Sequence, residues 1–515
     1  TRIADLERDP LVRELSPVLA EAAHAVASPQ LRTMGTVGGN ICQEPRCWYY
    51  RAAGDAFHCT RKGGRYCNAL TGDNRYHSLF GSLPIQTRPC TAACPGEIEI
   101  PEYLELLRAG DVDGAARRLL ARNPLPAITG RVCPHTCQDD CNRGLYDGAV
   151  SIRTVERYLG DHVLEHPELM GTPAPASGRR VAVVGSGPAG LAAAFYLRLR
   201  GHAVTVFERE PQPGGMLRYG IPSFRLPKDV LDRLLGACEG LGVEFRCGVA
   251  LGGPAGGDAA GAADPAGADS ARGSGDGDRV ELDELRAAHD GVFLATGAWG
   301  LPRIGLAGEE ELAGGLAFLT DVAKGARRVP GPRLLVVGGG SVAFDVAVTA
   351  RRLGARQVTV ACLESCDEMP ALLEEVEEAQ AEGIELLPSC GPARLLREDR
   401  RLTGIELVRC TSVFDEQCCF APSFDESERV VVEADEVILA VGQRVEADTL
   451  ARTGLELDGV RLAADGETGR TSAAGVYAGG DVVSGPATVI AAIAAGRRAA
   501  AALDEELGGL ASARD

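Results

Sequence analysis

The sequence predicts an α/β protein with two Rossmann-type domains, preceded by an α-helical domain and an irregular, cysteine-rich amino-terminal segment. Three observations support this prediction. Two segments, which begin near residues 180 and 333, read as an apolar strand, a glycine-rich turn and a helix. A third glycine-rich turn lies near residue 480, and nine cysteines precede residue 142. Strands that alternate with helices in this way are typical of parallel sheets covered by helices.

The composition excludes several classes of function. Its 53 Lys and Arg against 72 Asp and Glu give a formal charge of −19, so we expect neither nucleic acid nor an anionic membrane surface as a partner. The apolar runs are shorter than the roughly 20 residues of a membrane span, and the charged start has no signal-peptide core, so we expect a cytoplasmic protein. In that reducing compartment the 17 cysteines favour metal or redox chemistry over disulfides.

The first glycine-rich turn lies in RRVAVVGSGPAGLAAAFYLRLRGHAVTVFERE. Gly185, Gly187 and Gly190 allow the backbone to approach a pyrophosphate at the amino terminus of the following helix. Glu208 lies 23 residues after Gly185, at the end of the next strand, where a carboxylate can bind ribose hydroxyls. Because strand, helix and acid occur together, the segment indicates a dinucleotide site.

The second turn lies in PRLLVVGGGSVAFDVAVTARRLGARQVTVACLES and repeats the pattern. Gly338 and Gly340 occupy the first two glycine positions, Ser341 opens the helix, Ala343 occupies the third glycine position, and Glu364 follows the next strand. The chain is therefore expected to bind two dinucleotides.

The third turn lies in TSAAGVYAGGDVVSGPATVIAAIAAGRRAA. Gly480, Asp481 and Thr488 precede its long helix; Asp481 can reach a ribityl or phosphate oxygen, and the amino terminus of the helix can face a flavin. In this order the chain builds the first fold, inserts the second fold, and then returns to complete the first. This is the architecture of two-dinucleotide-binding, disulfide-reductase-like flavoproteins. The first site is therefore expected to hold FAD and the second a nicotinamide.

These assignments predict the domain boundaries. The FAD-binding domain is expected over residues 178–310 and 441–508, and the NAD(H)-binding domain over residues 311–440. Residues 251–278 are rich in Gly, Ala and Asp and offer almost nothing to bury, so we expect a disordered surface loop.

Further motifs make a family resemblance specific. They are PGGMLRYGIPSFRLPKDV, ATGA, DEMPA, AVGQ and GGDV. Over about residues 88 to 507 the chain resembles the small subunit of glutamate synthase, the amino-terminal half of dihydropyrimidine dehydrogenase and the large subunit of the electron-bifurcating transhydrogenase. The resemblance implies that NAD(P)H reduces FAD, with Gly215 in the FAD site, and that iron–sulfur clusters carry electrons to a partner subunit. Because hydride transfer is the cofactor's own chemistry, no catalytic acid or base is expected.

The second site departs from the pattern of the relatives that use NADPH. Those relatives carry arginines after the second strand, where this sequence has Leu363 and Glu364. An acid there favours a free 2′-hydroxyl and repels a 2′-phosphate. NADH is therefore expected, and NADPH is the less favoured cofactor.

Cysteines with short spacings occupy an expected helical domain over residues 83–170. Cys90-x3-Cys94-Pro and Cys133-x3-Cys137-x3-Cys141 are typical of iron–sulfur ligation, with zinc as the alternative. The family resemblance implies that Cys94, Cys133, Cys137 and Glu156 bind one cluster. Without the resemblance, Glu156 would be read as part of an exposed helix face.

The resemblance leaves a second cluster incomplete. Cys90 and Cys141 match two of its ligand positions, but the Cys-x2-Cys pair that supplies the other two is absent. This cluster is therefore either lost or completed from another part of the chain.

The segment over residues 1–82 carries a second resemblance. ASPQLRTMGTVGGNICQEPRCWYYR resembles a fragment of the FAD-binding subunit of molybdenum hydroxylases, the xanthine dehydrogenase and hydroxybenzoyl-CoA reductase group. Some of those subunits bind a four-iron cluster in an inserted loop, which implies four ligands: Cys42, Cys47, Cys59 and Cys67. The TVGGN motif is expected to bind no flavin, because the adjoining FAD-binding parts are missing. A recruited loop with free thiols is the alternative.

Together these features predict an NADH-linked FAD and iron–sulfur subunit with two four-iron clusters. It would pass electrons between nicotinamide and a partner catalytic subunit, a molybdopterin-containing hydroxylase or, as the alternative, the glutamate synthase large subunit. Two other classes remain open. A disulfide reductase would need a Cys-x-x-Cys against the flavin, which the later cysteines do not offer. A zinc-stabilised scaffold would not need either cofactor.

Overall fold

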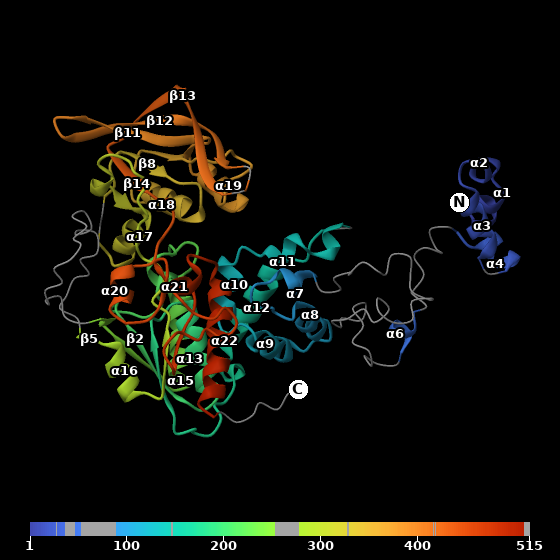
Figure 1. Ribbon diagram of the computed structural model, residues 1–515, viewed down its shortest axis with the longest axis horizontal. Coiled ribbons are helices and arrows are strands. Elements are labelled where there is room, and N and C mark those ends of the chain that lie inside the picture. Colours follow the sequence, from blue (N-terminus) through green and yellow to red (C-terminus); the bar gives the residue numbers. More distant parts are fainter. Residues whose placement is uncertain are drawn as a thin grey trace. The chain divides into compact units, whose positions relative to one another are not determined.

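The computed structural model describes residues 1–26, 28–36, 47–52, 89–145, 148–252, 278–326, 329–415, 417 and 419–508. Nearly all of the expected 251–278 loop lies outside these residues. The chain divides into two compact units, Thr1–Pro89 and Cys90–Asp515. Figure 1 labels the elements of both units.

The described residues of the first unit form short helices: α1 (Ile3–Arg8), α2 (Pro10–Leu15), α3 (Pro17–Ala25), α4 (Pro29–Met34) and α6 (Trp48–Arg51). A proline opens each of α2, α3 and α4, and Asp9 caps α2 by accepting hydrogen bonds from two backbone N–H groups. Glu7 joins three helices by pairing with His24 (2.8 Å) and Arg32 (3.0 Å). The described residues of this unit are therefore largely helical, because proline and capping signals define short helices that a search for long hydrophobic periods overlooks. Most of the predicted irregular, cysteine-rich stretch lies outside the described residues.

The second unit begins with a helical domain. Its elements are α7 (Pro89–Ala93), α8 (Ile100–Arg108), α9 (Val112–Leu120), α10 (Pro126–Val132), α11 (Thr136–Asp139), η2 (Asn142–Leu145), α12 (Ile152–Glu165) and η3 (Pro167–Met170). Helices α10 and α12 cross at two glycines: a Cβ on Gly130 would lie 2.4 Å from the Arg157 backbone, and one on Gly160 would lie 2.2 Å from Ala127 N. This close crossing fixes α12 against the end of α10.

The first dinucleotide fold is a parallel sheet of order β17-β6-β1-β2-β3. Its strands are β1 (Arg180–Val184), β2 (Ala203–Glu208), β3 (Val243–Cys247), β6 (Gly291–Leu294) and β17 (Val476–Ala478). Helices α13 (Pro188–Leu199), α15 (Lys228–Gly240) and α22 (Val489–Glu506) share a hydrophobic core with this sheet. Strand β1 is buried from its second residue on, as expected for a parallel strand covered on both faces.

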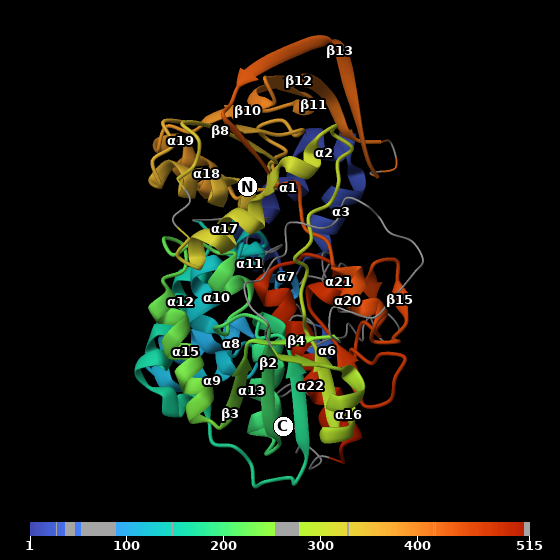
Figure 2. The same ribbon diagram turned by 90° about the vertical axis from the view of Figure 1, so that its left-hand side faces the viewer.

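The second dinucleotide fold is a parallel sheet of order β10-β9-β8-β14-β7. Its strands are β7 (Ala313–Gly314), β8 (Arg333–Val337), β9 (Gln357–Ala361), β10 (Glu385–Leu387) and β14 (Glu436–Leu439). One face packs on α17 (Gly315–Ala323), α18 (Ser341–Arg352) and α19 (Leu373–Ala381). The other face packs on an antiparallel sheet of β11 (Cys390–Glu398), β12 (Arg401–Phe414) and β13 (Phe420–Glu433), seen beside β8 in Figure 2.

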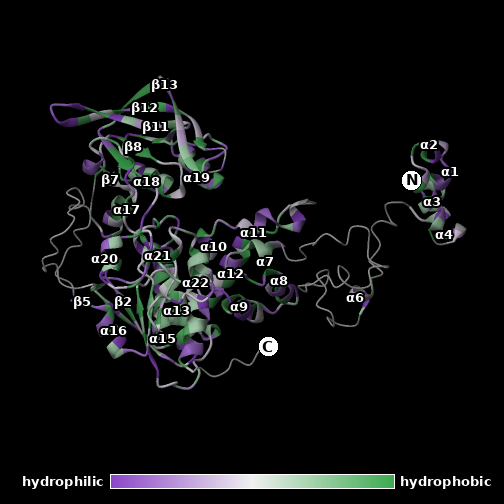
Figure 3. Cartoon of the chain, viewed as in Figure 1, coloured by the Kyte–Doolittle hydropathy of each residue, from purple (hydrophilic) through white to green (hydrophobic). Residues whose placement is uncertain are grey.

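Smaller elements complete the unit: β4 (Val249–Leu251) with β5 (Asp278–Val280), β15 (Leu457–Asp458) with β16 (Arg461–Leu462), α14 (Met216–Tyr219), α16 (Leu282–Ala288), η4 (Glu309–Glu311), α20 (Ala447–Ala451) and α21 (Asp481–Ser484). The inner strands of both parallel sheets are hydrophobic, whereas polar residues gather on the outer helices (Figure 3). No helix within the described ranges is both long and apolar enough to cross a membrane. The predicted α/β fold with two dinucleotide-binding folds is confirmed.

Candidate cofactor sites

The first glycine turn joins β1 to α13 in a conformation that depends on glycine. Gly185 has a φ of 100°, in the left-handed region, and its N–H donates to the carbonyl of Phe207 at 2.8 Å. A Cβ on Gly190 would lie 1.9 Å from the Gly185 carbonyl oxygen, so the helix can pack this closely only without a side chain. A Cβ on Gly187 would meet no atom within 4 Å. This open space at the amino terminus of α13 fits a pyrophosphate.

Segments far apart in the sequence meet at this turn. Gly215, with a φ of 51°, packs so closely that a Cβ there would lie 2.8 Å from the Gly187 Cα. Gly480, with a φ of 76°, lies against Ala189, the second residue of α13. The structure thus brings Gly187, Gly215 and Gly480 to the amino terminus of α13.

The carboxyl-terminal part of the site follows β17. Asp481 opens α21 and accepts a hydrogen bond from the N–H of Ala487 at 3.2 Å, while burial raises the pKa of Asp481 to about 6. Thr488 caps α22, because its hydroxyl accepts a hydrogen bond from the N–H of Ala491. The Thr488 side chain therefore has a structural task at the helix end that the sequence analysis did not assign.

Glu208 lies at the end of β2, where it holds the glycine turn. Its buried carboxylate accepts hydrogen bonds from the Ser186 N–H (3.0 Å), the Ser186 hydroxyl and the Glu210 N–H (2.9 Å). The Ser186 hydroxyl also accepts a hydrogen bond from the Gly214 N–H at 2.8 Å. Ser186 therefore ties three segments of the site together. Sequence reasoning missed it because it stands at a variable position of the glycine pattern.

The second glycine turn joins β8 to α18. Gly338 has a φ of 140°, a Cβ on Gly340 would meet no atom within 4 Å, and Ser341 is the first residue of α18. The Glu364 carboxylate lies over the turn, since a Cβ on Gly339 would be 2.7 Å from one of its oxygens. Gly340 of the second turn thus leaves the same open space at the start of its helix as Gly187 does in the first.

The helical domain gathers three cysteines and one glutamate. Cys133 follows α10, Cys137 lies in α11, Cys94 follows α7 and Glu156 lies in α12. Burial, reinforced by the charge of Glu156, raises the pKa of Cys94, raises that of Cys133 to about 11 and raises that of Cys137 further. Buried thiols whose ionisation is further opposed by one neighbouring carboxylate fit a cationic cluster, whose binding would favour their charged forms.

Glu156 does not lie on an exposed helix face, which is where the sequence without the family resemblance would put it. It is only 6% exposed, and the Tyr103 hydroxyl donates to its Oε1 at 3.3 Å. Burial raises the pKa of Glu156 to about 7, although the hydrogen bond from Tyr103 opposes the shift. The helix period alone does not reveal this burial, because Glu156 faces a cysteine group rather than an apolar core.

Cys90 and Cys141 form a second pairing. Burial raises the pKa of Cys90, and the charge of Cys141 adds to that increase. Burial acts to raise the pKa of Cys141 as well, yet backbone N–H groups, including that of Val150 at 3.5 Å from Sγ, lower it overall. In the first unit Cys47 is buried, whereas Cys42, Cys59 and Cys67 lie outside the described residues.

The cysteine group adjoins the flavin fold. A Cβ on Gly96, two residues after Cys94, would lie 2.8 Å from the Ile490 Cδ1. Ile490 is the second residue of α22, which begins directly after Thr488 and follows α21, the short helix that Asp481 opens in the candidate FAD site. Arg497 of α22 donates to the Gly96 carbonyl at 3.4 Å. The peptide after one cysteine therefore packs on the helix that starts at the FAD site.

Ion pairs connect the nicotinamide fold to its neighbours. Arg225 of the flavin fold pairs with Asp345 of α18 at 3.0 Å and with Glu375 of α19. Arg153 of α12 pairs with Glu374, with Nη2 at 2.8 Å from Oε2. Both acids paired to Arg225 are buried, and burial raises the pKa of Asp345 to about 7 against the effect of Arg225. Sequence reasoning missed these residues, because nothing in the local pattern pairs them.

This fold and these sites define a class of flavin- and nicotinamide-binding oxidoreductases with an added cysteine domain. Residues 179–496 match the family described as pyridine nucleotide-disulphide oxidoreductase, and the chain belongs to that family. Residues 83–168 match dihydropyrimidine dehydrogenase domain II, 4Fe-4S cluster, and residues 1–59 match the FAD binding domain in molybdopterin dehydrogenase. The predicted family and cofactor types, FAD and an iron–sulfur cluster, are confirmed at this level.

Curated relatives are similar over most of the chain. The NADP(+)-dependent formate dehydrogenase subunit beta of Moorella thermoacetica is 34% identical over 82% of this chain and 60% of its own length. The NADPH-Fe(3+) oxidoreductase subunit beta of Geobacter sulfurreducens is 31% identical, over 84% and 65%. The Glutamate synthase [NADPH] small chain of Escherichia coli is 33% identical, over 80% and 87%. The chain thus spans less than two thirds of the first two relatives.

Among solved structures, FprA from Mycobacterium tuberculosis in complex with NADPH matches with a TM-score of 0.51 and 20% identity. The match covers 65% of this chain and 85% of FprA. At this identity the likeness supports only the shared fold, with its two dinucleotide-binding domains.

Proposed function

We propose that this chain is the NADH-linked electron-transfer subunit of a larger oxidoreductase complex. When bound, FAD accepts hydride from the nicotinamide and releases electrons one at a time to an iron–sulfur cluster. The observation that carries the proposal is the packing of Gly96, just after Cys94, on Ile490 of α22. This contact supports the proposal, because Cys94, a candidate cluster ligand, is two residues from a glycine that packs on the helix following the candidate FAD site.

The chain's own residues would hold and orient these groups. The glycines of the first turn, with Gly215 and Gly480, form the pyrophosphate cradle, and Glu208 stabilises the turn through Ser186. Cys94, Cys133, Cys137 and Glu156 are the proposed ligands of one four-iron cluster. The charge of Glu156 contributes to the raised pKa of all three thiols, which supports this grouping. No side chain is required to move a proton.

The preference for NADH is part of the proposal. Glu364 supports it, because its carboxylate lies over Gly339 of the second turn. A carboxylate there accepts hydrogen bonds from ribose hydroxyls and repels a 2′-phosphate. Relatives named for NADP(+) or NADPH occur beside one named NAD-dependent, the dihydropyrimidine dehydrogenase subunit PreT of Salmonella typhimurium, so NADH must be tested against NADPH directly.

A second four-iron cluster is proposed in the first unit, with Cys42, Cys47, Cys59 and Cys67 as ligands. Support comes from the match of residues 1–59 to the molybdopterin dehydrogenase FAD domain and from the burial of Cys47. Replacing Cys59 and Cys67 with Ser should lower the iron content by about four atoms per chain. Replacing Cys137 should remove about four iron atoms of the other cluster, the one in the helical domain. Unchanged iron in the double variant would instead indicate a recruited loop with free thiols.

The match at residues 1–59 favours a molybdopterin-containing hydroxylase as the partner. The similarity to a glutamate synthase small chain supports the second candidate, a glutamate synthase large subunit. Purifying the complex from its native cells and measuring molybdenum against FAD tests both. About one molybdenum per FAD supports the first, and a molybdenum-free complex with glutamate synthase activity supports the second.

The electron-entry role is tested with the purified chain. It should contain FAD and iron and should reduce ferricyanide with NADH as the electron donor. A chain that binds zinc but neither flavin nor iron would be a scaffold, and the proposal would be wrong.

A further inference from the structure

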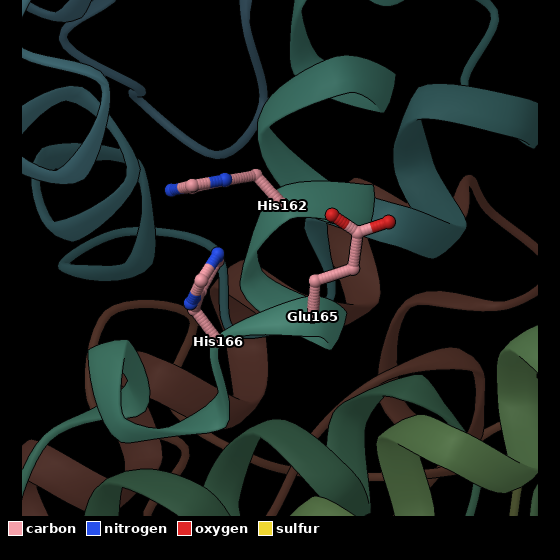
Figure 4. A group of neighbouring side chains, drawn as sticks. All are labelled: His162, Glu165 and His166. Carbon is pink, nitrogen blue, oxygen red and sulfur yellow. The ribbon is translucent and has the colours of Figure 1, made fainter.

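The carboxyl-terminal end of α12 carries a group of metal-binding side chains that the cysteine site does not include. His162, Glu165 and His166 each offer one ligand atom, and these three atoms lie within 4.8 Å of one another. Figure 4 shows the two imidazole rings on the same side of the helix end, with the Glu165 carboxylate extending from the same turn. The ring centroids of the two histidines are 4.5 Å apart.

Carboxylates hold both imidazoles in place. Asp113 of α9 lies 2.8 Å from His162 Nε2, and Glu168 of η3 lies 3.3 Å from His166 Nδ1. An imidazole that donates one N–H to a carboxylate presents its other nitrogen as a lone pair, as metal-binding histidines do. In this arrangement Nδ1 of His162 and Nε2 of His166 are the nitrogen atoms whose lone pairs can bind a metal ion.

The local electrostatics also favour a cation. Helix α12 has 14 residues, and its last carbonyl groups give its carboxyl-terminal end a partial negative charge. Glu165 is exposed and pairs with no side chain in the described part of the chain. The site therefore combines two oriented imidazoles, one unpaired carboxylate and the negative end of a helix.

We propose that His162, Glu165 and His166 bind a divalent first-row transition-metal ion such as Zn²⁺, with Asp113 and Glu168 orienting the imidazoles. Two imidazole nitrogens and one carboxylate oxygen are ligands that Zn²⁺ accepts, and water can complete its coordination. The bound ion stabilises the junction of α9, α12 and η3. His162 lies six positions after Glu156, about 9 Å along the helix, so the ion is distinct from the cysteine site.

The segment HVLEH repeats the H-x-x-E-H spacing of some zinc peptidases. In this chain α12 ends at Glu165, and Glu165 and His166 are exposed. The proposal is therefore metal binding without hydrolysis.

The test uses the intact, tag-free chain with its flavin and iron in place, dialysed anaerobically against Zn²⁺ and analysed for metal by mass spectrometry. The wild type should bind one Zn²⁺ that the His162→Ala/His166→Ala variant does not bind. Asp113→Asn should weaken this binding by about tenfold, because residues that orient ligands typically change metal affinity by 10- to 100-fold.

The matched control is His24→Ala. His24 Nδ1 also lies 2.8 Å from a carboxylate, that of Glu7, but no second histidine stands beside it in the described residues. This variant should bind Zn²⁺ as the wild type does. Unchanged iron and FAD in all variants will show that they fold. Equal Zn²⁺ binding by the wild type and the double histidine variant would overturn the proposal.

Discussion

The two dinucleotide-binding folds share a plan but use their acidic residues differently. In the first fold, Glu208 is 4% exposed and accepts hydrogen bonds from Ser186 and Glu210. In the second fold, Glu364 is half-buried, and its carboxylate lies over Gly339. The first acid stabilises its own glycine turn, whereas the second lies over its turn, where we propose that it contacts a ribose. The same position in two similar patterns can therefore serve the fold or the choice of cofactor.

The two folds also differ at the third glycine position of the turn. A Cβ on Gly190 would lie 1.9 Å from the Gly185 carbonyl oxygen, whereas the corresponding residue of the second fold, Ala343, carries a Cβ and is fully buried. The first turn packs more tightly on its helix.

The largest effect is expected from Gly187→Val and its counterpart Gly340→Val. In both turns the added side chain meets no protein atom near its Cβ, so each variant should fold, but each fills the space reserved for a pyrophosphate. Gly187→Val should yield colourless protein without FAD. Gly340→Val should keep FAD and lose NADH oxidation. Absorbance spectra and NADH-dependent ferricyanide reduction measure these two losses.

The pair has a clear opposite outcome. If Gly187→Val keeps its full FAD content and Gly340→Val loses FAD, then the second fold binds FAD and the first binds the nicotinamide, opposite to the assignment made above. Circular dichroism of each variant provides the control for folding.

An intermediate effect is expected at Glu364. The kcat/KM for NADH should exceed that for NADPH by roughly 5- to 150-fold, equivalent to about 1–3 kcal/mol for losing a favourable contact and meeting a like charge. Glu364→Arg should narrow or reverse this ratio, and Glu364→Gln should reduce it less. If the wild type uses both cofactors equally, Glu364 does not select the cofactor.

The smallest effect is expected from the two serines. Ser186→Ala removes the hydroxyl that links Glu208 to Gly214, so FAD should dissociate about fivefold more readily, equivalent to about 1 kcal/mol. Ser341 makes no side-chain hydrogen bond to another described residue, so Ser341→Ala should leave FAD affinity unchanged. Fluorescence of released FAD during dilution measures both affinities. If Ser186→Ala and Ser341→Ala release FAD equally readily, the Ser186 hydroxyl does not contribute to FAD binding in the way proposed.

Much of the α/β fold could be predicted from the sequence, because glycine turns between buried strands and helices have a specific spacing. The strands and helices around Gly185 and Gly338 lie where the pattern places them. The helices of the first unit were not expected, since they are short and defined by Asp9 and by prolines rather than by a hydrophobic period.

The candidate sites were only partly predictable. The cysteines stand out by type and spacing, whereas the burial of Glu156 depends on the crossing of α10 and α12 at Gly130 and Gly160. Ser186 and the ion pair between Arg225 and Asp345 depend on contacts between distant segments. No local pattern encodes such contacts, so the sequence alone does not reveal them.

The central claim is that electrons pass from NADH to the cysteine site only through the flavin of the first fold. Anaerobic NADH titration of the wild type and of Gly187→Val, followed by electron paramagnetic resonance of the iron, tests it most directly. The wild type should show bleached flavin and the signal of a reduced cluster, while flavin-free Gly187→Val should keep its iron oxidised at every NADH concentration. Reduction of the iron by NADH in the flavin-free variant would contradict the account.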